Sequence, residues 1–330
     1  MTPVVSVIVC FHRVTPYLRP AVRSLLDQSE RNLEILLVDN GTGAGLNALG
    51  DDGRDPRLRL LPQMRNLGIA GGHNAALAHA RGEFIALLDS DDIALPMRLE
   101  RQVAALRADP DLGLVASAAD RIDAHGKIIG RAFTLGAARD HLRFTAYSNA
   151  ATAPTFTGRR EVFVRFPYRE GLELAADYDF LARATESASA CALQETLGQY
   201  RVHPAQSTRE SFDRQWFTAC LIRLMTGRRR AGRDEDFGVL QREYETRLAV
   251  PPSRRETAAH FAVRCLADGQ PRLAAYHARK LAAFRASPRD VLAAFRLAAA
   301  AVRAAAGERT LVARLFLTGP LRAHGLRPLR

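Results

Sequence analysis

Three carboxylates stand within four positions of one another in Asp89-Ser90-Asp91-Asp92. They follow residues 84–88, a continuous apolar run with the length of a strand that is buried on both faces of a sheet. Carboxylates at the rim of a core are costly unless a cation compensates them, and Mg²⁺ usually binds one or two carboxylates together with substrate phosphates. The spacing Asp89-x-Asp91 therefore predicts a metal–diphosphate site. Taken alone, these residues equally suit a polar turn that begins the next helix.

The elements that position this segment alternate between strands and helices. We expect strands over residues 4–10, 33–38, 57–61 and 84–88, and helices over residues 16–28, after a glycine-rich loop within 66–81, and from Pro96 onward. This alternation predicts an α/β fold with a mostly parallel sheet flanked by helices. In such sheets ligands bind at the carboxyl ends of the strands, where both Asp39 and Asp89 fall.

The second half of this region, residues 112–203, is less regular. We expect a strand over 112–116, a hairpin turn at 123–127, a loop or short strand over 152–158 and the end of a strand at 200–203. A helix is expected to begin near Ala175, with Asp177 and Asp179 in its first turn. Carboxylates are favourable there because they interact with the positive end of the helix dipole.

The positive charge of the chain is concentrated in its C-terminal part. The net charge is +12, and residues 251–330 hold 15 Lys and Arg against 4 Asp and Glu, whereas the other 250 residues hold 32 against 31. We predict a catalytic domain over 1–205, a helical connection over 206–250 and a basic helical C-terminal region over 251–330, with helices starting near residues 253, 271 and 288. Arg289, Arg296 and Arg303 line one face of the third helix, which suits either an anionic membrane surface or partner, or a solvated face.

Several classes of protein are disfavoured by composition. Met1-Thr2-Pro3 leads directly into a strand-like run, so we expect no signal peptide, and no apolar window has the length of a membrane span. The four cysteines are widely spaced, as in proteins of a reducing cytoplasm. We expect a cytoplasmic protein, held at the inner face of the membrane if the basic region binds lipid. Nucleic acid is not an expected partner, because the first 250 residues are nearly neutral and contain no recognisable nucleic-acid-binding motif.

Six segments together resemble the inverting family-two glycosyltransferases, which have the GT-A (Rossmann-like) fold. They are Ser6-Val7-Ile8-Val9, Leu37-Val38-Asp39-Asn40-Gly41-Thr42, Asn66-x-Gly68 through Asn74, the run from Ala80 to Asp92, Asp177-Tyr178-Asp179-Phe180 and Tyr200-Arg201-Val202-His203. The resemblance covers about residues 4–205, and its specificity lies in the order and spacing of the segments.

This resemblance implies a metal-dependent transferase that moves a sugar, with inversion, from a nucleoside-diphosphate sugar to an acceptor hydroxyl in bacterial polysaccharide or glycoconjugate synthesis. It implies the following roles: His12 and Asp39 contact the nucleotide base, Asn66 belongs to the substrate-binding loop, Asp89 holds the ribose side of the donor, Asp91 and His203 bind Mg²⁺ or Mn²⁺, and Asp177 is the catalytic base. The chemistry agrees, since displacement at the anomeric carbon needs a base for the acceptor proton and a cation for the departing diphosphate.

The chain departs from the family pattern at three places. Cys10-Phe11-His12-Arg13 replaces P-x-Y-N, His73 replaces a common Arg before Asn74, and Ala176 replaces the Glu before the base. These changes leave the nucleotide preference and the acceptor class open. Each of His12, His73 and His203 also suits an ordinary structural role. Two other functions remain as alternatives. A nucleotidyltransferase should carry a Gly/Lys/Arg-rich phosphate loop after its first strand, and a non-catalytic sugar-nucleotide-binding scaffold would not need both Asp91 and Asp177.

Overall fold

The structure is a computed structural model that describes residues 2–132, 153–172, 174–206, 212–240, 242, 257–258, 260–262, 265 and 270–283. The chain divides into two compact units, Met1–Glu210 and Ser211–Arg330. The finer predicted division at residues 205 and 250 stays a prediction. In the second unit, α7 (Phe212–Arg230) and α10 (Pro271–Ala283) are described, and α10 begins at the proline where a helix start was predicted. The predicted helix from residue 288 and its arginine face lie outside the described residues.

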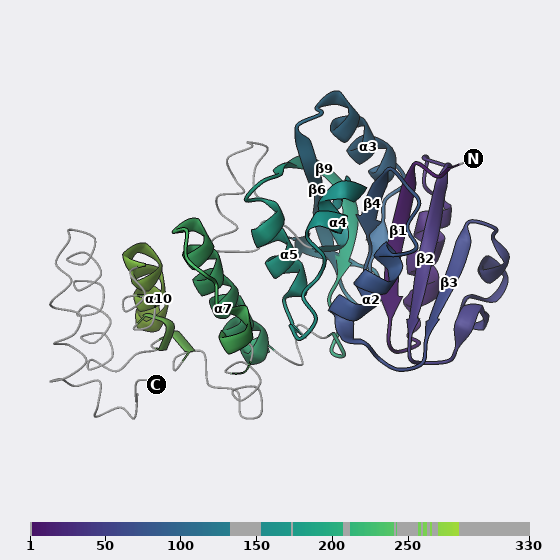
Figure 1. Cartoon of the computed structure of the whole chain (residues 1–330). Helices are drawn as coiled ribbons and strands as arrows, with labels where there is room; N and C mark the ends of the chain where they lie inside the picture. Colours follow the sequence, from purple (N-terminus) through teal and green to yellow (C-terminus); the bar gives the residue numbers. More distant parts are fainter. Residues whose placement is uncertain are drawn as a thin grey trace, which may run out of the picture. The chain divides into compact units, whose positions relative to one another are not determined.

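The first unit is built on one sheet (Figure 1). Its strands are β1 (Val5–Phe11), β2 (Leu33–Asn40), β3 (Leu58–Gln63), β4 (Phe84–Leu87), β5 (Ile93–Ala94), β6 (Leu112–Ile122), β7 (Ile128–Arg131), β8 (Thr157–Arg159) and β9 (Ser189–Arg201). Among the described residues the order is β3-β2-β1-β4-β8-β6-β9-β5, with β7 paired to β6. The predicted α/β class is confirmed.

Parallel pairing, which was predicted for most of the sheet, holds for β1 to β4 and again for β6 with β9. The sheet as a whole is mixed, because β5 lies antiparallel to β9, β7 to β6, and the short strand β8 to both β4 and β6. Because β8 has only three residues, its pairing depends on long-range contacts and leaves no periodic pattern in the sequence.

Helices cover both faces of the sheet, which explains why its strands are apolar on both sides. On one face lie α1 (Leu18–Leu26), the 3-10 helix η1 (Gly45–Arg54) and α3 (Arg98–Ala108), packed against strand residues such as Val7 and Val9. On the other lie α2 (Gly68–Leu77), α4 (Arg160–Arg165) and α5 (Ala176–Ala184), packed against residues such as Ile8. Figure 1 shows α2 and α4 on the near side of the strands. Each fully buried Val, Leu or Ile contributes about 1.5–3 kcal/mol to folding.

A buried polar clamp joins β1, β2 and β4 near their N-terminal ends. The hydroxyl of Ser6 donates to Oε1 of Glu34 at 2.7 Å and accepts from the N–H of Gly82 at 2.8 Å. The guanidinium of Arg81 donates to Oε2 of Glu34 at 2.8 Å. Burial would raise the pKa of Glu34, but hydrogen bonds from Ser6, Arg59 and Arg81 outweigh it and hold this pKa below its ordinary value. Arg81-Gly82, part of the long motif that ends in the carboxylates, therefore serves the fold.

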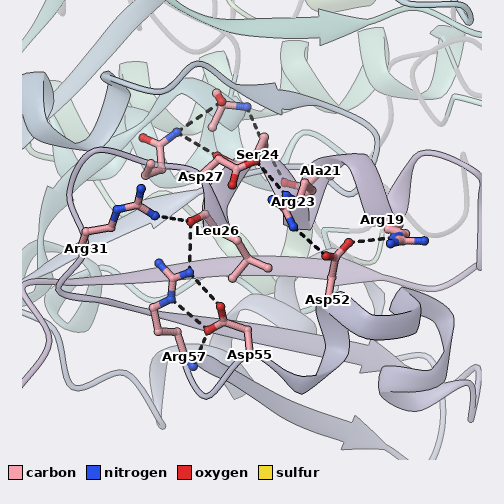
Figure 2. A network of polar contacts seen from close by, with 12 residues as sticks. Arg19, Ala21, Arg23, Ser24, Leu26, Asp27, Arg31, Asp52, Asp55 and Arg57 are labelled. Atoms are coloured by element: carbon pink, nitrogen blue, oxygen red, sulfur yellow. Dashed lines mark hydrogen bonds and ion pairs between the residues drawn. The ribbon is translucent and has the colours of Figure 1, made fainter.

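A second network fixes the C-terminal end of α1 (Figure 2). The carbonyl oxygen of Leu26 accepts from Nη1 of Arg31 at 3.0 Å and from Nη2 of Arg57 at 3.1 Å. Asp52, in η1, accepts from Nε of Arg19 at 2.8 Å and Nη1 of Arg23 at 3.1 Å. These bonds satisfy a carbonyl group at the C-terminal end of α1 and tie α1 to η1.

Within the described part of the chain, no helix combines the length and the apolar character that crossing a membrane requires.

Candidate functional site

The end of β4 delivers three carboxylates into one small volume. Among the described residues, Asp89, Asp91 and Asp92 each offer an oxygen atom within 4.8 Å of the others. The strand is buried in the middle of the sheet, and the N–H of Asp92 donates to the carbonyl oxygen of Asp89 at 3.2 Å in a tight turn. The cluster predicted from the sequence therefore exists, at the carboxyl edge of the parallel strands, where ligands bind in open α/β sheets.

The cluster is electrostatically incomplete. Burial, together with the charges of Asp91 and Asp177, raises the pKa of Asp89 to about 7. Burial also raises the pKa of Asp92 well above its ordinary value, and its Oδ2 atom is buried with no hydrogen-bond partner among the described residues. Carboxylates whose pKa values are raised by burial and by each other would be stabilised in the ionised form by an added cation. The donor set is all oxygen apart from one imidazole, and it suits a hard divalent ion.

A fully buried arginine supports the cluster from within the core. Arg98, on α3, donates from Nη2 to the carbonyl oxygens of Leu87 at 2.8 Å and Phe156 at 3.2 Å. Burial lowers the pKa of Arg98 to about 10, while the charges of Asp92 and Asp89 oppose that shift. Sequence reasoning missed this residue. The sequence contains an indication of its burial, because Arg98 and Gln102 are four residues apart and lie on the same face of the predicted helix as its buried apolar residues.

His203 and Asp91 form a direct pair although 112 residues separate them. Nε2 of His203 lies 2.8 Å from Oδ2 of Asp91. This is hydrogen-bond distance, and it places an imidazole nitrogen and a carboxylate oxygen, both of which can bind a divalent ion, side by side. The two residues predicted as metal ligands are therefore brought into direct contact.

Arg201 holds the main chain of this acidic loop. Its Nε donates to the carbonyl oxygen of Asp91 at 2.8 Å, and its backbone N–H donates to Oδ1 of Asp92 at 2.7 Å. Its guanidinium carbon lies 4.7 Å from the ring centroid of Tyr17, whose ring lies 4.9 Å from that of His203. Arg201 belongs to the motif Tyr200-Arg201-Val202-His203, but the sequence analysis assigned a role only to His203 of that motif. It did not identify Tyr17 as a site residue.

Asp177 lies in the first turn of α5 and is half-buried. Its charge contributes to the raised pKa values of Asp89 and of Tyr168, after burial in each case, so the three side chains share one region of the site. Asp179, two positions further, has a different environment. Its carboxylate is fully buried and accepts from Nε of Arg183 at 2.8 Å and Nη1 of Arg169 at 3.4 Å. Asp179 therefore stabilises the helix and its surroundings and is not available to a substrate.

Asp39 is engaged by its own turn. Its Oδ1 accepts from the N–H of Thr42 at 2.8 Å and from the Thr42 hydroxyl at 2.6 Å, and its Oδ2 accepts from the N–H of Gly45 at 3.0 Å. Burial opposes ionisation, but these bonds hold the pKa of Asp39 below its ordinary value. The carboxylate is ionised and shapes the loop after β2, and its contact with a nucleotide base stays a prediction.

Asn66 and His12 stand on the loops after β3 and β1, and both are exposed. Oδ1 of Asn66 accepts from Nδ2 of Asn40 and from the N–H of Gly68, each at 2.9 Å. The buried Asn40 amide also accepts from the N–H of Leu67 at 2.9 Å, so it organises the whole turn. The sequence indicated this turn through Asn66 and missed Asn40. Nε2 of His12 accepts from Nε of Arg13 at 3.2 Å. The substrate contacts of Asn66 and His12 stay predictions.

His73 has a structural role. Nδ1 of its ring lies 2.8 Å from the carbonyl oxygen of Ile69, one turn earlier in α2, and the ring lies 4.8 Å from that of Tyr168. Burial lowers the pKa of His73, so the ring is neutral near pH 7. Of the two readings of this histidine, the structure supports the ordinary packed side chain.

Comparisons with known proteins agree with this architecture. Residues 6–165 match the model of glycosyl transferase family 2. An uncharacterized glycosyltransferase of Methanocaldococcus jannaschii is 28% identical over 206 residues, which are 61% of this chain and 71% of that protein. The succinoglycan biosynthesis protein ExoO of Rhizobium meliloti is 27% identical over 297 residues, 80% of this chain and 84% of that protein.

A solved structure shows the same fold. The crystal structure of residues 1–349 of S. aureus TarS in complex with UDP-GlcNAc matches with a TM-score of 0.57 and 19% identity, over 84% of this chain and 88% of that one. At that identity the likeness concerns the fold, which is the GT-A fold of glycosyltransferases. The family match extends across the strands that carry the acidic cluster, and it shows that residues 6–165 form a glycosyltransferase family 2 domain.

Proposed function

We propose that this glycosyltransferase takes its sugar from a nucleoside-diphosphate sugar, requires Mg²⁺ or Mn²⁺, and inverts the anomeric configuration. The observation that carries the proposal is the 2.8 Å approach of His203 Nε2 to Asp91 Oδ2, beside the half-buried carboxylate of Asp89. Such a pair could hold the divalent ion that neutralises the diphosphate of a donor. The TarS complexes with UDP and with UDP-GlcNAc support a donor of this class, and UDP sugars are the first to test.

Asp91 and His203 would hold the ion, and Asp89 would lie toward the ribose and sugar of the donor. A bound Mg²⁺ or Mn²⁺ ion supplies positive charge that stabilises the departing diphosphate. Arg201 contributes by fixing the backbone of Asp91, and Arg98 by holding the carbonyl end of β4. The chain's own residues thus set the position of the donor before the acceptor arrives.

Asp177 acts as the general base in this proposal. Its carboxylate takes the proton of the acceptor hydroxyl while a lone pair of that oxygen forms the new bond to the anomeric carbon. The bond from this carbon to the diphosphate oxygen breaks, its electron pair leaves with the diphosphate, and the configuration inverts. The neighbouring Asp179 cannot replace Asp177, because its carboxylate is buried and paired with Arg183 and Arg169.

The test is a screen of nucleoside-diphosphate sugars with Mn²⁺, in which release of the nucleoside diphosphate is measured with and without EDTA. Release with one donor that EDTA abolishes supports the proposal, and the anomeric configuration of the isolated product tests inversion. Full turnover in EDTA would remove the metal from the mechanism. Binding of a nucleotide sugar without hydrolysis or transfer to any acceptor would support the scaffold alternative, and release of pyrophosphate from nucleoside triphosphates the nucleotidyltransferase.

We also propose that the reaction contributes to bacterial polysaccharide or glycoconjugate synthesis and that the basic C-terminal region binds anionic lipid. The named role of ExoO supports the first point, and the surplus of +11 over residues 251–330 supports the second. Each basic residue near an anionic surface contributes about 1 kcal/mol. Replacement of Arg289, Arg296 and Arg303 by Glu in the full chain should abolish co-sedimentation with phosphatidylserine vesicles at low salt. Failure of the unaltered chain to bind such vesicles would contradict the lipid proposal.

A further inference from the structure

The ring of Tyr17 contacts two side chains at the C-terminal end of β9, one on its last residue and one two residues beyond it. The guanidinium carbon of Arg201 lies over it, 4.7 Å from the ring centroid. The imidazole of His203 lies 4.9 Å from the same centroid, with the two ring planes tilted by 43°. Tyr17 immediately precedes α1, so an aromatic side chain from the first loop of the fold lies against the imidazole that pairs with Asp91.

The same loop is fastened to this segment at a second point. Nη2 of Arg13 donates to the carbonyl oxygen of Ala205 at 3.4 Å, and Nε of Arg13 donates to Nε2 of His12 at 3.2 Å. The loop of residues 12–17 therefore carries both His12, expected at the nucleotide base, and Tyr17, at the imidazole of His203. The loop that would contact the nucleotide base is therefore joined to the segment that would bind the diphosphate.

The two members of the Asp91–His203 pair are held in different ways. Asp91 is fixed through its main chain, because Arg201 donates to its carbonyl oxygen and the acidic loop is closed by its own hydrogen bond. The main chain of His203, two residues beyond β9, is held by the N–H of Gln206, which donates to its carbonyl oxygen at 3.2 Å, but this bond leaves the orientation of the imidazole to its side-chain contacts. An imidazole ring at such a position gains a defined orientation from packing against another ring, at a favourable centroid distance. Groups that orient a metal ligand typically change metal affinity by 10–100-fold when they are lost.

We propose that Tyr17 is a positioning residue that orients the imidazole of His203 beside Asp91, and so couples the loop of residues 12–17 to divalent-ion binding. The inference rests on the proposed function, because it concerns the ion that Asp91 and His203 would share. It assigns Tyr17 no contact with substrate. Its ring, and not its hydroxyl, carries the effect, since the contacts to Arg201 and His203 are made by the ring.

The test measures the dissociation constant of Mn²⁺ in the presence of UDP, from the electron paramagnetic resonance signal of free Mn²⁺. Tyr17→Leu removes the ring and should weaken Mn²⁺ binding by about 10–100-fold. Tyr17→Phe keeps the ring and should bind Mn²⁺ as the unaltered protein does. Val14→Ala, on the same loop with a side chain that is 51% exposed, is the matched control and should change nothing. Tyr17→Met serves as a second variant if the thermal unfolding of Tyr17→Leu shows a lost fold.

A double-mutant cycle with His203→Ala separates an effect through His203 from a general loosening of the loop. In the His203→Ala background, Tyr17→Leu should cause no further loss of Mn²⁺ affinity. Unchanged Mn²⁺ binding by Tyr17→Leu, or an equal further loss in the His203→Ala background, would overturn the role of Tyr17 and leave the proposed function standing. Absence of Mn²⁺ binding by the unaltered protein with UDP would overturn the proposed metal dependence, and this inference with it.

Discussion

The hydroxyl of Ser6 accepts a hydrogen bond from the backbone N–H of Gly82 at 2.8 Å, although 76 residues separate them. The approach is so close that a Cβ atom on Gly82 would lie 2.5 Å from the backbone nitrogen of Ser6. This contact fixes β4 against β1 at the end of the sheet opposite the acidic cluster. The glycine of the long motif is therefore required by the packing of two backbones and not by the donor.

Replacement of Gly82 by Ala should lower the free energy of unfolding by about 1–3 kcal/mol, because an added methyl group has to displace the backbone of β1. The measurement is chemical denaturation at pH 7. Gly238→Ala is the matched control, since its added Cβ would meet only the flexible end of Arg242, at 3.9 Å. Equal stability of the two variants would show that the strands have room that the structure does not indicate.

The carboxylate of Glu34 should make stability depend on pH in one direction. Hydrogen bonds hold its pKa below the ordinary value of about 4.3, so its contribution is present above that value and is lost as the pH falls through the lower folded-state pKa. Glu34→Gln should cost roughly 1–3 kcal/mol at pH 7, the usual range for a lost charge-assisted hydrogen bond, and the difference from the unaltered protein should shrink in acid. Denaturation curves between pH 3 and pH 7 measure it, and a difference independent of pH would contradict the prediction.

The parts of the fold that could be predicted from the sequence are those with local periodicity. The apolar runs of β1, β2 and β4 predict buried strands, and the spacing of Leu99, Val103 and Leu106 predicts the helix α3. The pairing of β8 between β4 and β6 could not be predicted, because three residues carry no period and their partners lie far along the chain. That short strand, together with the antiparallel pairing of β5 with β9 and of β7 with β6, makes the sheet mixed.

For the site, the sequence supplied the residues whose types suit the chemistry, and the structure supplied those that hold them. The motifs indicate Asp91 and His203 as metal ligands, and the structure shows their direct contact. Arg98 and Tyr17 were missed for a physical reason. A buried guanidinium and a ring contact over 186 residues depend on tertiary packing, which neither charge nor hydrophobic pattern records.

Asp91→Asn should reduce sugar transfer by about 10³-fold, because several kcal/mol of stabilisation of the departing diphosphate would be lost with the ion. The fold should be retained, since the bond from Arg201 reaches the backbone of Asp91 and not its side chain. Initial rates at saturating Mn²⁺ measure the effect. Glu83→Gln, an exposed carboxylate of the same motif paired with Arg107, is the control and should keep full activity. A nearly normal rate for Asp91→Asn would exclude this carboxylate as a ligand.

Asp177→Asn should lose roughly 10²–10⁴-fold in transfer, the usual value of general-base catalysis, because the amide keeps the size of the side chain and loses its basicity. The affinity for the donor should change little, since Asp89, Asp91 and His203 lie on the donor side of the proposed site. Asp179→Asn provides the contrast within the same helix turn. Its carboxylate is fully buried and paired with Arg183, so that variant should lose stability. Transfer rates with the true acceptor, together with thermal unfolding of both variants, separate the two roles, and a nearly normal transfer rate for Asp177→Asn would mean that another residue is the base.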